Sequence, residues 1–97
     1  MRRGEIWRYQ GLGRQRLVLV VSDDELNGRG EPIVVDITET GPEGPLALLT
    51  VRVGEWGFAR SRRLTFADAD RFTEQVAQMS AEVMDQVDVA LRVALSL

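Results

Sequence analysis

Apolar positions occur along this chain in short runs, and turn-forming residues separate them. The run Leu17–Val21 has five apolar residues in succession, too few for a helix, and it predicts a central strand. Turn signals are GLG at 11–13, NGRGEP at 27–32 and TGPEGP at 40–45. We predict further strands at 5–9, 33–38, 46–53, 58–66 and 72–77, the last of them at a sheet edge.

One amphipathic helix is predicted near the C-terminus. Ser80 is a good N-cap, and Glu82 suits the positive end of a helix dipole. Apolar residues recur at helical spacing from Val83 to Leu95, so we expect this stripe to pack against the sheet. Five or six short strands closed by one helix predict a mainly β fold, a small barrel with a C-terminal helix, in a single domain of residues 1–97.

Residue types that are absent narrow the chemistry. The chain has no cysteine and no histidine, which excludes disulfides, thiolate catalysis and a Ser-His-Asp triad. The acidic run SDDE at 22–25 offers oxygen ligands, but adjacent side chains cannot converge on one cation, so we expect a solvated turn and no metal or cofactor. No segment approaches the ~20 apolar residues of a membrane span, and residues 1–8 lack the apolar core of a signal peptide. We expect a cytoplasmic protein.

Charge is distributed unevenly along the chain. All twelve basic residues are arginine, and the net charge is −3. Residues 1–30 carry six arginines against four acids, whereas residues 64–97 carry two against six. An acidic chain is poorly suited to nonspecific nucleic-acid binding, so any RNA or DNA site is expected to be local and near the N-terminal third. Guanidinium groups are planar forks that match phosphate oxygens.

Four segments together resemble one family. They are RRGEIWR at 2–8, RLVLVVSDDELN at 16–27, VVDIT at 34–38 and MSAEVMDQVDVALRVAL at 79–95. In this order they resemble the MazF/PemK (Kid) toxins, small ribonucleases of bacterial toxin–antitoxin pairs, with a looser match at 41–69. The resemblance implies an SH3-like barrel with a C-terminal helix, a homodimer, and neutralisation by an antitoxin with a disordered tail. It also implies metal-independent cleavage of single-stranded RNA, leaving a 2′,3′-cyclic phosphate and a 5′-hydroxyl.

The resemblance assigns two catalytic positions. Arg16, which opens the second strand, takes the place of the family's catalytic arginine, and Thr38, which ends the next, takes that of its partner threonine. The chemistry is consistent with these residue types. An arginine fork can grip two phosphate oxygens while a 2′-hydroxyl attacks, and a hydroxyl on a rigid strand adds a hydrogen bond to the same phosphate.

The chain departs from the family pattern at the first loop. The family joins its first two strands by a long loop whose glutamate helps catalysis, whereas only QGLGRQ lies between Tyr9 and Arg16. Asp36 shares a strand face with Thr38, because residues two apart in a strand point the same way. Asp36 is therefore a candidate general base in place of the missing glutamate. The alternative is a structural ion pair with Arg14 or Arg16.

Further residues are candidates for RNA contact. Arg14 and Gln15 adjoin Arg16, and the run ARSRR at 59–63 follows two aromatic residues, the interleaving typical of a single-strand groove. We expect Arg60 and Arg62 to contact RNA, with an ordinary solvated face as the alternative.

Two other functions are compatible with the sequence. One is a catalytically degenerate toxin that only binds an antitoxin. The other is a CcdB-like gyrase inhibitor, although such proteins use a Trp–Gly–Ile-type tail and this chain ends in RVALSL. The sequence leaves open the RNA motif, the choice between mRNA and tRNA, and the identity of the antitoxin.

Overall fold

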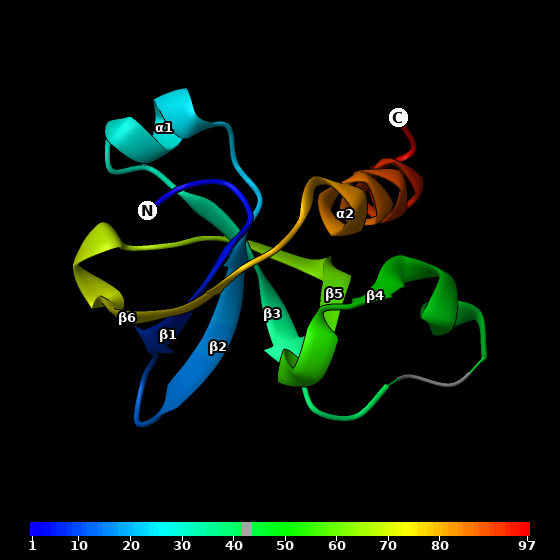
Figure 1. The fold of residues 1–97 in the computed structure, drawn as a ribbon, viewed down its shortest axis with the longest axis horizontal. Coiled ribbons are helices and arrows are strands. Elements are labelled where there is room, and N and C mark those ends of the chain that lie inside the picture. Colours follow the sequence, from blue (N-terminus) through cyan, green and yellow to red (C-terminus); the bar gives the residue numbers. More distant parts are fainter. Residues whose placement is uncertain (42–43) are drawn as a thin grey trace.

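A computed structural model describes residues 1–41 and 44–97 of the chain. It contains one antiparallel sheet of six strands in the order β4-β5-β3-β2-β1-β6, with a long helix, α2, against one of its faces (Figure 1). The strands are β1 (Glu5–Gln10), β2 (Gln15–Val20), β3 (Ile33–Thr38), β4 (Thr50–Arg52), β5 (Phe58–Phe66) and β6 (Phe72–Gln78). The predicted mainly β fold with a C-terminal helix is confirmed. Within the described residues β4 and β6 end the sheet unpaired with each other, so the barrel is open.

The central strand β2 is apolar because both of its faces are covered. Leu19 belongs to the core beneath α2, whereas Val18 and Val20 belong to a second cluster on the opposite face. All three side chains are fully buried. Successive side chains of a strand point to opposite faces of the sheet, so a strand that is covered on both faces needs apolar residues at successive positions. This explains the apolar run Leu17–Val21.

The helix α2 (Ala81–Leu95) begins where its sequence predicts. The hydroxyl of Ser80 accepts a hydrogen bond from the backbone N–H of Val83 at 3.2 Å, which is an ordinary N-cap. Met84, Val87 and Ala90 are buried against the sheet, while Leu95 is half exposed. The apolar stripe therefore packs on the core through its middle. Among the described residues, no helix is long and apolar enough to cross a membrane.

One predicted strand is largely wrong. In place of a strand over 46–53, residues Gly44–Leu49 form a 3-10 helix, η1, and only Thr50–Arg52 pair as β4. The physical reason lies in the side chains, because LALL contains no β-branched residue and the strand begins at the β-branched pair Thr50 and Val51. The turn predicted at 40–45 falls in part on 42–43, which lie outside the described residues.

The acidic run at 22–25 is not a plain turn. Residues Asp24–Gly28 form a short helix, α1, and the carboxylate of Asp23 caps it by accepting a hydrogen bond from the backbone N–H of Glu25 at 3.0 Å. Acidic residues in the first turn stabilise the positive end of such a helix. The acidic run therefore starts a helix. Within the described residues, no group of three or more His, Cys, Asp or Glu is placed to hold a metal ion.

Candidate active site

The two central strands separate at one end. β2 and β3 pair only from Val18 opposite Asp36 to Val20 opposite Val34. Before Val18, the residues of β2 pair only with β1, and after Asp36 those of β3 pair only with β5 in the described part of the chain. Figure 1 shows the two arrows diverging from this point. The separation opens a cleft of about 490 Å³ between the strands.

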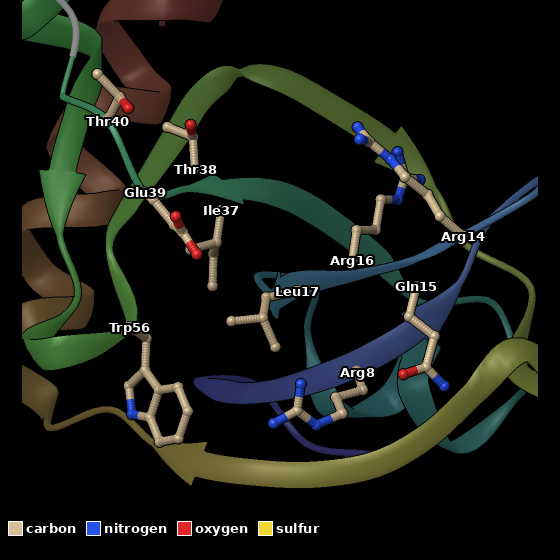
Figure 2. Close-up of a pocket in the computed structure, with 10 residues that line it drawn as sticks. All are labelled: Arg8, Arg14, Gln15, Arg16, Leu17, Ile37, Thr38, Glu39, Thr40 and Trp56. Carbon is tan, nitrogen blue, oxygen red and sulfur yellow. The ribbon is translucent and has the colours of Figure 1, made fainter.

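The cleft is lined mainly by residues from the diverging strand ends (Figure 2). The lining contains three arginines and one carboxylate, so it carries more positive than negative charge. The cleft is thus suited to an anionic ligand. Its lining residues are Arg8, Arg14, Gln15, Arg16, Leu17, Ile37, Thr38, Glu39, Thr40 and Trp56.

The two predicted catalytic residues lie on opposite walls of this cleft. Extending the register of β2 and β3 by two residues past Val18 and Asp36 brings Arg16 opposite Thr38. Figure 2 shows both side chains pointing to one side of the sheet, whereas the next residue of each strand toward the cleft floor points to the other. A phosphate entering between the strands would meet a guanidinium from one wall and a hydroxyl from the other. The two neighbours that form the floor are Leu17 and Ile37.

The side chain of Arg16 is held in place on two sides. Its guanidinium carbon lies 5.4 Å from the centre of the Tyr9 ring, and its Nη1 lies 3.3 Å from Oδ1 of Asp36. The Tyr9 ring is itself fixed, because its hydroxyl accepts a hydrogen bond from the backbone N–H of Asp68 at 2.9 Å. The Arg16 side chain is still 37% exposed. It is therefore positioned in advance and open to a ligand.

Asp36 is buried and surrounded by arginines. Its carboxylate lies 3.3 Å from Arg16, 3.6 Å from Nη2 of Arg60 and 3.8 Å from Nε of Arg63. Of the two arginines that the sequence offered for an ion pair, Arg16 makes one and Arg14 does not, among the ion pairs of the described residues. Asp36 is not among the residues that line the cleft, and it lines a neighbouring hollow together with Arg16.

A bulge in β5 creates this arginine cluster. Val35 is opposite Leu64, but the next residue of β3, Asp36, is opposite Arg60, so Ser61–Arg63 have no partners in β3. Bulges of this kind re-aim side chains. Arg60 and Arg62, which the sequence predicts to contact RNA, both lie at this bulge. Arg60 pairs with Asp36, and Arg62 lines a second hollow on the bulge. Arg63, the last residue of the same ARSRR run, also reaches Asp36.

Glu39, like Arg8, lines the cleft and was missed by the sequence reasoning. It follows Thr38 directly, beyond the end of β3, and supplies the only carboxylate in the described lining of the cleft. Figure 2 shows its side chain lying beside Ile37, toward the cleft floor where Trp56 forms the far wall. The available signal was its place at a strand end, next to a candidate catalytic residue. Arg14 and Gln15 lie at the opposite end of the cleft, as labelled in the same view.

These features define a small open β sheet with an arginine-lined cleft at the end of its central strands. Residues 2–95 match the family described as PemK-like, MazF-like toxin of type II toxin-antitoxin system, and the chain belongs to this family. The resemblance drawn from the four sequence segments is therefore confirmed. No curated protein matches the chain in sequence.

Solved structures share the fold across the whole chain. An endoribonuclease in complex with its cognate antitoxin from a Mycobacterial species superposes with a TM-score of 0.90 at 20% identity, covering 100% of this chain and 96% of that one. MazF of a MazE–MazF complex from Deinococcus radiodurans gives 0.84 at 23% identity, with 100% and 96% covered. The Mycobacterium tuberculosis toxin MazF-mt6 gives 0.79 at 16% identity, with 96% and 97% covered. At these identities the likeness concerns the fold.

Proposed function

We propose that this protein is the toxin of a type II toxin–antitoxin pair and cleaves single-stranded RNA without a metal ion. The observation that carries the proposal is the pair Arg16 and Thr38, which face each other across a cationic cleft between two separating strands. Membership of the toxin family supports the biological role. The solved relatives described as endoribonucleases support the reaction class.

The proposed reaction uses the 2′-hydroxyl of the RNA as nucleophile. Its oxygen attacks the adjacent phosphorus, the bond to the 5′-oxygen of the next nucleotide breaks, and a 2′,3′-cyclic phosphate and a 5′-hydroxyl result. Arg16 binds non-bridging phosphate oxygens and stabilises the negative charge that grows on them in the transition state. Thr38 donates a hydrogen bond to the same phosphate. The leaving 5′-oxygen takes a proton from solvent.

The 2′-hydroxyl must lose a proton during this attack, and a carboxylate can accept it. We assign this step to Glu39, which follows Thr38 in the chain, points toward the cleft floor and is the one carboxylate in the described lining of the cleft. Asp36, the candidate drawn from the sequence, is given the other role considered for it, the ion pair that positions Arg16. Arg14, Gln15, Arg60 and Arg62 are assigned to contacts with the RNA backbone beyond the scissile phosphate.

The family also indicates partners. The solved relatives include complexes with a cognate antitoxin and with MazE. We extend this to the present chain as a homodimer in the cytoplasm, neutralised by an antitoxin whose disordered tail covers the cleft.

The test is an RNA cleavage assay with purified protein in EDTA. Cleaved single-stranded RNA with 2′,3′-cyclic phosphate ends is the expected result. Cleavage that stops on chelation and returns with magnesium would contradict the proposal.

A second function, an antitoxin-binding protein without catalysis, is favoured by one observation. Only Gly11–Arg14 join β1 to β2, so the loop is shortened and the glutamate that it carries in the family is missing. Tight antitoxin binding without any RNA cleavage would establish that alternative.

A further inference from the structure

A second hollow, of about 320 Å³, lies on the bulge of β5. We call it the bulge hollow. Arg16 lines both this hollow and the cleft, so the two meet at its side chain. In the reaction described above, the scissile phosphate lies in the cleft and not in the bulge hollow. Its lining residues are Arg16, Asp36, Arg62, Arg63, Leu64 and Thr65.

Positive charge around the bulge hollow exceeds negative charge. The described ion pairs of Arg16, Arg60 and Arg63 all end on the single carboxylate of Asp36. Three guanidinium groups against one carboxylate leave two positive charges uncompensated. Arg62 lines the hollow as well, and the described ion pairs do not include it. In a chain with a net charge of −3, such a concentration of arginines creates a local field that attracts anions.

The hydrogen-bonding capacity of the cluster is also unmet. Nε of Arg16, Nε of Arg60 and Oδ1 of Asp36 are buried without a hydrogen-bond partner in the described structure. Buried polar atoms are nearly always satisfied, and those that are not call for an explanation. A regular ladder would place one residue of β5 opposite Asp36, whereas the bulge brings two arginines to it. The bulge therefore concentrates cations at a cost in hydrogen bonding, as expected of a binding site.

We propose that the bulge hollow binds a second phosphate of the RNA, next to the phosphate in the cleft, through Arg62 and Arg63. This inference rests on the ribonuclease function proposed above. The RNA backbone passes from the cleft over Arg16 to the bulge, and guanidinium forks bind the phosphate oxygens there. Asp36 is the internal counter-ion that holds the arginines together while no RNA is bound. The second phosphate site replaces part of the grip that a longer loop between β1 and β2 would supply.

Binding measurements on the variants Arg62→Gln, Arg63→Gln and the double variant test this site. The probe is the intact substrate RNA with a 2′-O-methyl group on the nucleotide whose 2′-hydroxyl would attack. This modification removes the nucleophile, so the RNA binds but is not cleaved. We expect the double variant to bind about tenfold or more weakly, with the slope of log Kd against log salt shallower by about 0.7, because one phosphate of the single strand is no longer neutralised. Arg92→Gln on α2, across the sheet, is the matched control for charge.

Single methylphosphonate linkages locate the second phosphate, because each removes the charge of one phosphate. In the parent, the linkages that weaken binding include the scissile one and one neighbour, and in the double variant the neighbour's effect disappears. An unchanged Kd and salt slope in the double variant overturns the inference. So does an equal weakening at every linkage, which indicates diffuse attraction only.

Failure of the proposed function is distinguishable from failure of this site. Inorganic phosphate is titrated into the uncomplexed protein while the arginine side-chain N–H signals are followed by NMR. If the parent cleaves no RNA but shows phosphate-dependent shifts at Arg62 and Arg63 and none at Arg92, the phosphate site stands and the ribonuclease function is contradicted. If the parent cleaves RNA and the variants bind RNA normally, the second phosphate site is contradicted and the ribonuclease function stands.

Discussion

Arg16 Nη1 lies 3.3 Å from Asp36 Oδ1, and this ion pair joins β2 and β3 at the point where the two strands separate. Beyond it the strands diverge and the cleft begins. The ion pair therefore positions the Arg16 guanidinium where the cleft begins, and Thr38 lies on the opposite wall of the cleft. A cation held in this way needs no reorganisation when phosphate charge develops.

The first prediction concerns Arg16 itself. Arg16→Ala should lower the single-turnover cleavage rate by about 10²–10³-fold, the usual effect of removing one donor to a developing oxyanion. Arg16→Lys should also lose most of the rate, because an ammonium cannot bind two phosphate oxygens as a fork. Thermal melting shows that each variant is folded, and Arg92→Ala on α2 controls for the removal of one charge. An Arg16→Ala protein as active as the parent would place the site elsewhere.

The second prediction separates the two carboxylates. Glu39→Gln should slow single-turnover cleavage by about 10²–10⁴-fold with little loss of RNA affinity, as expected for removal of a general base. Asp36→Asn should leave the rate within a few-fold and lower the free energy of unfolding by about 1–3 kcal/mol, since Arg16, Arg60 and Arg63 lose the charge of the carboxylate that they share. The reverse pattern, a large rate loss in Asp36→Asn alone, would return the general base to Asp36. Kinetics and melting of both variants decide between them.

One of these carboxylates was predictable from the sequence and the other was not. Periodicity located β3 and β5 correctly, because burial on both sides of β3 and the turns that flank it leave a local signal. The register between them left none. That Asp36 faces Arg60 and Arg63 together depends on a bulge, and the resulting cluster joins residues that are far apart in the sequence. The place of Glu39 in the cleft depends on the separation of β2 from β3, which no local pattern encodes.

A third prediction concerns acid stability. The pKa of the Asp24 carboxyl is lowered below its ordinary value, first because the backbone N–H of Arg3 donates a hydrogen bond to it at 2.8 Å, and second because the Asn27 side chain donates another at 3.1 Å. A depressed pKa in the folded state contributes stability above the unfolded value, and this is lost as the pH falls through the folded value. Asp24→Asn should therefore flatten the acid limb of stability against pH. Denaturant unfolding of parent and variant from neutral to acidic pH measures it.

A fourth prediction is that the protein is a homodimer. Leu48, Phe66 and Leu97 are each more than three-quarters exposed in the single chain, which is unusual for large apolar side chains. A two-fold interface would cover part of this surface. Light scattering at micromolar concentration should give twice the mass of the 97-residue chain. A monomer mass under those conditions would refute the assignment.

The last prediction follows from the short connection between β1 and β2. Gly11–Arg14 close it as a tight turn, in which the backbone N–H of Gly11 donates to the carbonyl of Arg14 at 2.9 Å and Gly13 has a φ of +85°. Leu12 at its tip is almost fully exposed.

Such a turn cannot reach across the cleft, so we expect weak binding of short single strands and a low intrinsic rate. A folded RNA that presents the same sequence in a loop supplies its own rigidity, and it loses less entropy on binding. We therefore expect kcat/KM to be higher for the folded RNA than for the unstructured oligonucleotide, through a lower KM. The two substrates are compared with the parent protein in the same buffer. Equal kcat/KM values for both substrates would show that the open cleft grips single strands fully without a covering loop.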